Sequence, residues 1–304
     1  MNTTRLSCSL LIIILLANCS TPNRKSETVF DVEAYNKTIE DWQQKRNAYQ
    51  VSEDGWVNLA GLFWLKEGIN AFGSGKMNDL VFPQGKIPEQ AGYFIVQGNA
   101  VTVKANKGVL FTVNGKQVDG GTLFHPDSSR ISMAYGPLRW FVIKREDKLG
   151  IRLRDLENPL LKEFKGIEFF PIDRQWRVEG KVEWADSSRT IEITNVLGQT
   201  LQQRSVATLV FDYSGKTYRL DALDEGNDEF FIIFGDETNA RETYGAGRYL
   251  YVPLPDSAGR VIIDFNKAYN PPCAFTEFAT CPLPPKQNVL PFAVTAGEKN
   301  YGDH

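Results

Sequence analysis

The sequence predicts a mainly β protein, in which one amphipathic helix precedes two antiparallel β domains. From residue 55 onward, short runs of β-branched and aromatic residues alternate with Gly, Asn and Asp, which is the spacing of strands and turns in a sandwich or barrel. Residues 176–184 alternate so regularly that both tryptophans, Val178 and Val182 are expected on one face of a strand. Over residues 31–49, apolar residues recur at steps of three and four, the period of a helix.

The N-terminus has the features of a bacterial lipoprotein signal peptide over residues 1–18. Arg5 precedes an apolar run over residues 6–16, which is shorter than the roughly 20 residues of a membrane-spanning helix. The run leads into Leu-Ala-Asn-Cys, so Cys19 is expected to become the lipidated first residue, and Ser20 behind it carries no aspartate signal for inner-membrane retention. We expect acyl chains such as palmitate to anchor the protein in the cell envelope, in the outer membrane facing the periplasm. The alternative is an ordinary secretory signal with Cys19 as an incidental thiol.

The rest of the chain divides into four predicted parts that differ in composition and hydrophobic pattern. These are a tether over residues 19–30, an amphipathic helix over 31–50, a β-sandwich over 55–160 and a second β domain over 165–300.

The strands of both domains are expected where β-rich runs lie between turn residues. The predicted strands are 93–96, 101–105, 109–113, 131–135, 140–145 and 150–154, then 176–184, 190–194, 207–213, 217–223, 229–234, 248–252 and 261–265. The pair Asn114-Gly115 predicts a tight hairpin turn, because both residues accept the positive φ that such a turn needs.

Composition limits the classes of partner. The formal net charge of −3 arises from 34 basic and 37 acidic residues with no dense basic cluster, so nucleic acid is not an expected partner. A hydrophobic content of 42% with 12% aromatic residues is typical of a well-packed globular protein. No apolar stretch after the signal approaches spanning length, so only the lipid is expected to enter the membrane.

Two cysteines remain for structural or chemical use, because Cys8 leaves with the signal and Cys19 carries the lipid. In an oxidising compartment, Cys273 and Cys281 are expected to form a disulfide, which closes a short loop and contributes about 2.5 kcal/mol. A reactive thiol pair or a pair of metal ligands is the alternative. Metal is the weaker of these, because the spacing is not that of a zinc site and the chain has only two histidines. We expect no metal and no cofactor.

Motifs that carry known chemistry are absent from the sequence. It contains no GxSxG, HExxH or CxxC. The triplet Gly215-Lys216-Thr217 resembles the end of a P-loop, but it lacks the upstream glycine and leads into a strand-like segment. A Ser-His-Asp triad would need His125, which lies in a polar loop and is better explained as a surface histidine, or the terminal His304.

Part of the first β domain resembles the forkhead-associated (FHA) sandwich. The resemblance rests on residues 67–82, the turn 114–116 and residues 136–143. FHA domains bind phosphothreonine through an arginine that follows a glycine and through a Ser-x-x-His loop, because a phosphate dianion needs charged and hydroxyl donors. Ser74 stands at the arginine position, and residues 83–93 contain neither Ser nor His. The resemblance therefore implies the shape of the domain without phosphopeptide binding.

A second resemblance extends over residues 56–299. The strings that carry it are Gly-Leu-Phe-Trp-Leu at 61–65, Ile-Arg-Leu-Arg-Asp at 151–155, Phe-Pro at 170–171, and the segments 236–249 and 264–285. They are similar to the bacterial family DUF1684. The function of that family is unknown, so the resemblance implies no activity.

Candidate ligand-binding residues gather in the second β domain, in and before the irregular segment 264–285. These residues are Glu242, Tyr244, Arg248, Asp264, Asn266, Tyr269 and Asn270. Polar groups on the loops of a rigid β scaffold are where ligands usually bind. Gly245 and Gly247 would let backbone N–H groups approach an anion, with the guanidinium of Arg248 as a bidentate donor.

Two functions remain open. One is an envelope lipoprotein that binds a small polar or anionic ligand, or a protein, in its C-terminal domain. The alternative is a hydrolase-like enzyme with Glu242 or Asp264 as base and Arg248 holding an anionic substrate. Either site requires Tyr244, Arg248, Asp264 and Asn270 to share one pocket, whereas a structural role would pair Arg248 with Asp264.

Overall fold

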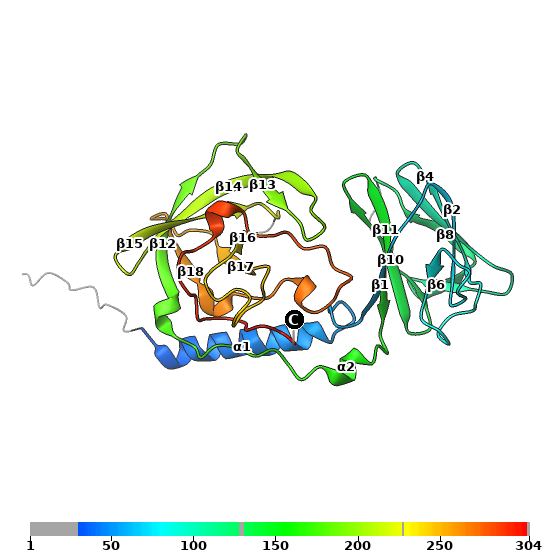
Figure 1. The fold of residues 1–304 in the computed structure, drawn as a ribbon, viewed down its shortest axis with the longest axis horizontal. Helices are drawn as coiled ribbons and strands as arrows, with labels where there is room; N and C mark the ends of the chain where they lie inside the picture. Colours follow the sequence, from blue (N-terminus) through cyan, green and yellow to red (C-terminus); the bar gives the residue numbers. More distant parts are fainter. Residues whose placement is uncertain (1–29, 128–130, 227, 303–304) are drawn as a thin grey trace, which may run out of the picture.

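The computed structural model describes residues 30–127, 131–226 and 228–302. A long helix, α1 (Val32–Gln50), comes first and is capped by the Asp31 side chain, which accepts a 3.0 Å hydrogen bond from the Ala34 amide. Two β domains follow and lie side by side, with α1 running along one side of the C-terminal domain toward the N-terminal one (Figure 1). The protein is thus mainly β with one long N-terminal helix, as predicted.

The N-terminal domain is a sandwich of two sheets. In spatial order, the first sheet contains β1 (Leu59–Trp64), β11 (Lys148–Asp155), β10 (Leu138–Arg145), β9 (Met133–Tyr135), β6 (Phe111–Val113) and β7 (Lys116–Val118). The second contains β3 (Leu80–Val81), β2 (Gly68–Gly73), β4 (Gly92–Gln97), β5 (Ala100–Ala105) and β8 (Gly120–Phe124). Neighbouring strands are antiparallel, except that β2 and β3 are parallel.

The predicted hairpin at Asn114-Gly115 is confirmed. Both residues have positive φ, 48° and 76°, and they join β6 to β7 with Val113 opposite Lys116. The sequence patterns missed β1, β2, β3, β7 and β8, of which β1, β2 and β8 contain glycine and β3 and β7 are only two and three residues long. In β2 the glycine is required by close packing, because a Cβ on Gly73 would lie 2.3 Å from the carbonyl oxygen of Glu89.

Aromatic rings fill the interior of the sandwich. Phe72 is fully buried, and its ring centroid lies 4.2 Å from that of Phe94, 5.3 Å from Phe82 and 5.9 Å from Trp140. Residues of both sheets therefore meet at this one side chain.

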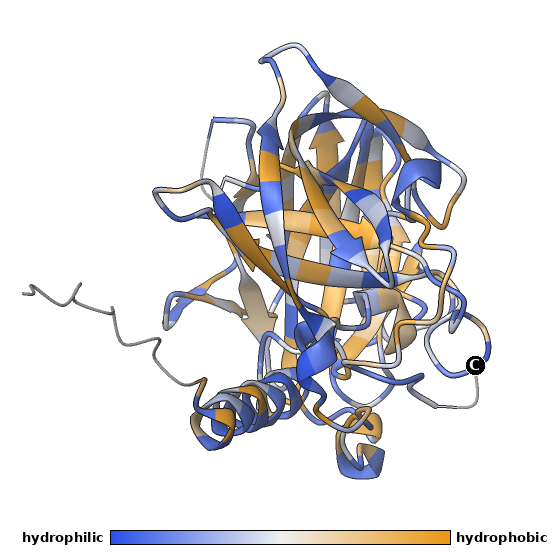
Figure 2. Ribbon diagram, turned by 90° about the vertical axis from the view of Figure 1, so that its left-hand side faces the viewer, coloured by the Kyte–Doolittle hydropathy of each residue, from blue (hydrophilic) through white to orange (hydrophobic). Residues whose placement is uncertain are grey.

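The C-terminal domain is a curled antiparallel sheet. In spatial order it contains β17 (Arg248–Pro253), β16 (Glu229–Phe234), β15 (Lys216–Leu223), β14 (Thr200–Tyr213), β12 (Arg177–Trp184) and β18 (Arg260–Asp264), and β13 (Thr190–Thr194) pairs with the first half of β14. The edge strands β17 and β18 approach each other without pairing, so the sheet curls almost into a barrel. Hydrophobic residues, orange in Figure 2, are concentrated in the strands in the middle of the molecule, whereas the loops at the rim are mostly hydrophilic.

The predicted strands of this domain are all present, with two differences. β14 begins seven residues earlier than expected, because its first half pairs with β13. Val178 and Val182 pack against the core, but Trp184, expected on the same buried face, is 63% exposed at the end of β12.

Short helices complete the chain. They are α2 (Leu160–Glu163) between the domains and the 3₁₀ turns Arg174–Trp176, Phe265–Lys267, Pro272–Ala274 and Lys286–Asn288. The domains also touch directly, because the Arg145 Nε of β10 donates a 3.2 Å hydrogen bond to Thr280 of the C-terminal domain.

We expect Phe72→Ala to destabilise the protein by about 3–5 kcal/mol, because it leaves a cavity that the facing rings cannot fill. The measurement is urea unfolding followed by tryptophan fluorescence. Met77→Ala serves as the control, since Met77 is 96% exposed. An equal shift of the two midpoints would contradict the assignment of Phe72 as the centre of this core.

Candidate functional site

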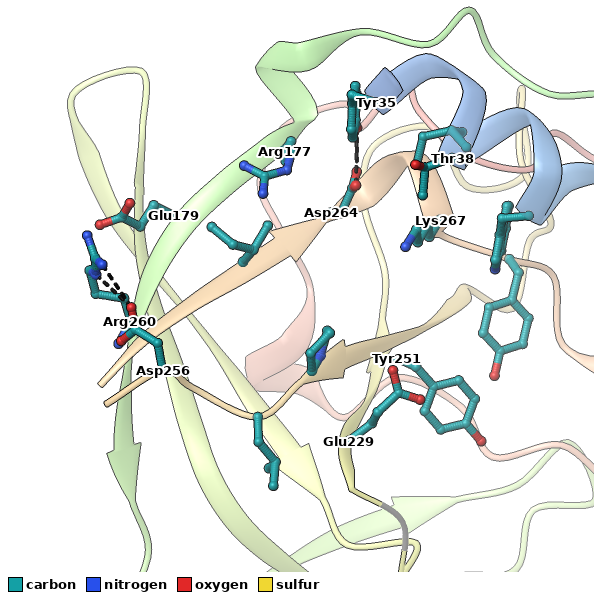
Figure 3. Close-up of a pocket in the computed structure, with 16 residues that line it drawn as sticks. Tyr35, Thr38, Arg177, Glu179, Glu229, Tyr251, Asp256, Arg260, Asp264 and Lys267 are labelled. Carbon is teal, nitrogen blue, oxygen red and sulfur yellow. Dashed lines mark hydrogen bonds and ion pairs between the residues drawn. The ribbon is translucent and has the colours of Figure 1, made fainter. Parts of the chain in front are cut away.

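A cavity of about 710 Å³ lies between α1 and the outer face of the C-terminal sheet. It covers the seam where β17 and β18 remain unpaired. Figure 3 shows side chains from α1, from strands on both sides of the seam and from the segment after β18 around this space. Small-molecule sites occupy about 300–1,000 Å³, so the volume suits a small ligand.

One end of the cavity wall is a hydrogen-bonded set of three side chains. The Tyr35 hydroxyl of α1 donates to both oxygens of the Asp264 carboxylate, at 3.0 and 3.1 Å. Asn266 Nδ2 donates to the Tyr35 oxygen at 2.9 Å and to Asp264 Oδ1 at 3.1 Å. Burial and the Asp264 carboxylate raise the pKa of Tyr35, so its hydroxyl stays protonated as a donor. Asp264 is therefore fixed in place by α1.

The other end of α1 is held by a buried ion pair. Arg46 Nε donates to Glu298 Oε1 at 2.6 Å, and the Glu298 side chain has no exposed surface. The second Glu298 carboxylate oxygen, Oε2, accepts a 2.7 Å hydrogen bond from the backbone N–H of Asn270. The Arg46 guanidinium also lies 4.7 Å from the centroid of the Tyr269 ring.

Aromatic side chains line the middle of the cavity. The rings of Tyr251 and Tyr269 are nearly parallel, with centroids 6.0 Å apart and 16° between their planes, and Trp42 of α1 contributes a third ring. The Tyr251 hydroxyl donates a 2.6 Å bond to Glu225. Burial, followed by that bond, raises the pKa of Tyr251, so this hydroxyl also stays protonated. Flat apolar walls of this kind suit the body of a small organic molecule.

The charged side chains of the cavity are only partly paired with one another. Arg260 forms an ion pair with Asp256, with Nη2 and Oδ2 2.8 Å apart. Among the described residues, no ion pair is formed by Arg177, Lys267 or Glu229. Arg177 lies against the rings of Phe30 and Tyr35, at 5.4 and 5.9 Å from their centroids. The cavity thus offers charges that a ligand can pair with.

Three of the predicted site residues lie at this cavity. Asp264 and Tyr269 line it, and Asn266 holds its Tyr35–Asp264 wall. The irregular segment that begins at Asp264 therefore contributes a wall of this cavity.

Arg248 does not lie at the cavity. Its side chain has no exposed surface, and Nη2 donates to Asp236 at 2.8 Å and to the Val294 carbonyl at 2.8 Å. Burial lowers the pKa of Arg248, and Asp236 opposes that shift. Both sequence-based expectations for this residue are corrected: it does not face a ligand, and its ionic partner is Asp236 rather than Asp264.

Gly247, directly before Arg248, is required both by the positive φ of a turn and by close packing. Gly247 has φ +85°, and a Cβ there would lie 2.4 Å from Pro284 Cγ and 2.7 Å from the Phe234 carbonyl. Its amide donates to the Tyr244 carbonyl at 3.1 Å rather than pointing at an anion site. The expected anion cradle is therefore replaced by a tight turn under the proline-rich segment.

The remaining predicted residues lie apart from the cavity. Glu242 is exposed, and Tyr244 is half-buried in an apolar cluster with Ile167 and Phe275. Asn270 is buried, and its Nδ2 donates to the Lys299 carbonyl at 2.7 Å. Tyr244, Arg248, Asp264 and Asn270 therefore do not share one pocket.

Cys273 and Cys281 form a disulfide, with Cα atoms 6.1 Å apart. It closes a loop that packs on the outer face of β16 and β17, where Cys281 is buried beside Phe231 and Tyr249. The Tyr249 hydroxyl donates to the Pro282 carbonyl at 2.8 Å, which ties the loop to the sheet.

The sequence patterns missed the α1 side of the cavity and two of its cations. Tyr35 and Trp42 were recognised only as part of an apolar helix face, and Lys267 lies inside the segment 264–285 without having been singled out. The signal that could have found them is the polar tip of Tyr35 on an otherwise apolar stripe. Nothing in the sequence indicates that Arg177 and Lys267 lack acidic partners.

Neither a metal site nor a spanning helix is found in the part of the chain that the structure describes. No three His, Cys, Asp or Glu side chains of these ranges are arranged to hold a metal ion. None of their helices combines the length and the apolar character needed to cross a bilayer. Cys19 and the predicted signal peptide lie outside the described residues.

The C-terminal part of the chain matches a known family. Residues 162–299 match the family described as a protein of unknown function, DUF1684. These residues form a DUF1684 domain. The domain includes every strand of the curled sheet and the segment after β18, whereas α1 precedes it in the chain and completes the cavity from outside. No curated protein matches the chain.

Two solved structures are similar to parts of the chain. An uncharacterized protein of Haloarcula marismortui is 33% identical, with a TM-score of 0.40, over 47% of this chain and 80% of its own. An FHA domain from a study of phosphothreonine-dependent interactions is 16% identical, with a TM-score of 0.22, over 31% of this chain and 92% of its own.

We expect Arg248→Met to reduce stability by about 3–5 kcal/mol, because it leaves the buried Asp236 carboxylate without its counter-charge. Urea unfolding measures the change. In the control, Arg260→Met removes an exposed ion pair at the rim of the cavity and should leave the midpoint near that of the parent protein. A stable Arg248→Met protein would show that this guanidinium is not needed for the fold of the DUF1684 domain.

Proposed function

We propose that the protein is an envelope lipoprotein whose DUF1684 domain binds a small anionic or polar ligand in the cavity under α1. The observation that carries the proposal is the presence of two cations without acidic partners, Arg177 and Lys267, beside aromatic walls in a hollow of about 710 Å³. Cationic side chains without acidic partners are available for a carboxylate or phosphate, and aromatic walls suit the organic part of such a ligand.

The proposed lipid anchor fits the position of the cavity. Phe30 lies beside Arg177 at the start of α1, so the tether enters the fold next to the site. From Cys19 to Phe30 an extended chain reaches about 38 Å, at roughly 3.5 Å per residue. The ligand would then be met close to the membrane that carries the lipid.

The hydrolase alternative lacks an assembled site. Glu242 lies outside the cavity, and Arg248 is buried against Asp236, so neither can act on a substrate beside Asp264. Binding of a small ligand is also favoured over binding of a protein, because α1 encloses the hollow from one side.

Binding can be tested on the full chain in mild detergent with acetate, hexanoate, benzoate and inorganic phosphate. We expect at least one anion to raise the Tm saturably, and Lys267→Met to weaken its calorimetric affinity about 10-fold, because a charge-assisted hydrogen bond is lost. Lys45→Met is the matched control, since Lys45 is an exposed lysine of α1 that does not line the cavity. Equal responses of the parent protein and Lys267→Met to all four anions would refute the proposed site.

Lipidation can be tested by intact mass spectrometry of the protein from the outer-membrane fraction. We expect a chain that begins at Cys19 and carries acyl chains, because residues 1–18 have the pattern of a lipoprotein signal. Cys19→Ala should retain the full signal or be released to the periplasm. A mature chain with an unmodified Cys19 would refute the proposed lipid anchor but would not contradict the proposed ligand site.

A further inference from the structure

The unpaired charges of the cavity differ in sign between its two sides. Arg177 and Lys267 lie on the α1 side, on either side of Asp264, whereas Glu229 lies across the space beside Tyr251 (Figure 3). Glu229 is at the start of β16, and Arg177 is at the start of β12, two strands that are separated in the sheet by β14 and β15. The two charge signs are thus held apart by the fold itself.

Each of the other charged groups of the cavity has a hydrogen-bond partner, an ion-pair partner or a neighbouring charge of opposite sign. The Asp264 carboxylate accepts hydrogen bonds from Tyr35 and Asn266. Asp256 is paired with Arg260, and Glu179 lies near the same arginine. Two cations on one side and Glu229 on the other remain for a ligand.

We propose that the ligand is a zwitterion, with its anionic group between Arg177 and Lys267 and its ammonium beside Glu229 and the Tyr251 ring. This inference rests on the proposed function and names the chemical class of its ligand. A simple anion that filled the cavity would meet the Glu229 carboxylate, and a simple cation would meet Arg177 and Lys267. Only a molecule with both charges complements both sides.

The ammonium side has a second element of recognition. The face of a tyrosine ring attracts a cation, and the stacked Tyr251–Tyr269 pair presents aromatic surface next to Glu229. The Tyr251 hydroxyl is turned to Glu225, which adds negative charge to the same side of the cavity. Between the two sides, Trp42, Ile262 and Pro253 provide apolar surface for a short carbon spacer.

The required chemistry is a primary ammonium joined to a carboxylate or phosphate. Free amino acids and peptides supply the carboxylate form, and an ethanolamine phosphate headgroup supplies the phosphate form. Calorimetry with 6-aminohexanoate and with O-phosphoethanolamine separates these two sources. Hexanoate and hexylammonium serve as the matched ligands that carry one charge each.

We expect 6-aminohexanoate or O-phosphoethanolamine to bind the full chain about 10-fold more tightly than either single-charge ligand, because each lost ionic contact weakens binding by roughly that factor. Glu229→Gln should reduce the affinity for the preferred zwitterion about 10-fold and leave hexanoate binding unchanged or stronger. Lys267→Gln should weaken the zwitterion and hexanoate alike. Glu89→Gln in the N-terminal sandwich is the control, and circular dichroism verifies that each variant is folded.

The outcomes separate this inference from the function on which it rests. If hexanoate binds as tightly as the zwitterions, with dependence on Lys267 but not on Glu229, the site binds anions and the zwitterion inference is wrong. If none of the four ligands binds, both proposals are refuted. If only hexylammonium binds, the roles given to Arg177 and Lys267 are wrong.

Discussion

The buried carboxylate of Glu298 is the contact on which the arrangement of the C-terminal domain and α1 depends. It accepts from Arg46 of α1 and from the Asn270 amide, while its own backbone N–H donates to the Ala268 carbonyl at 2.8 Å. One residue near the end of the chain thereby joins the first helix to the segment after β18. A buried carboxylate without such partners is strongly unfavourable, so the three segments stabilise the fold only together.

The cavity under α1 results from the same contact and from the incompletely closed sheet. Because β17 and β18 do not pair, their outer faces do not form one continuous surface, and α1 lies across the seam with the cavity beneath it. Tyr35 at one end and Arg46 at the other fix the height of the helix above the seam. Hydrogen bonds thus hold the α1 wall in place, while Arg177 and Lys267 form no ion pair among the described residues, a combination suited to ligand recognition.

Local sequence patterns predicted much of the fold, since helix period, strand alternation and the Asn114-Gly115 turn act over a few residues. They missed strands in which glycine is needed for close packing, as at Gly73. They also failed at pairing. Arg248 lies opposite Phe234 in the β16–β17 register, which brings it to Asp236, whereas Asp264 lies opposite Arg177 on the far edge strand. The strand register determines which acidic side chain lies close to which basic side chain, and the residues around each of them in the sequence do not reveal that register. For the same reason the segment 264–285 could be recognised as part of a site, but not the helix that faces it.

The contacts between α1 and the last part of the chain have a kinetic consequence. Tyr35 and Arg46 bind partners 229 and 252 positions further along, among the most distant pairings in the molecule. Contacts of such long range form late, because the closure of a large loop must precede them. During synthesis, α1 emerges before both β domains, and its apolar stripe stays uncovered until the segment that contains Glu298 has been made. The cavity is therefore among the last features to form, and a chain that ends before Glu298 would retain the sandwich but lose the contact that holds α1 over the cavity.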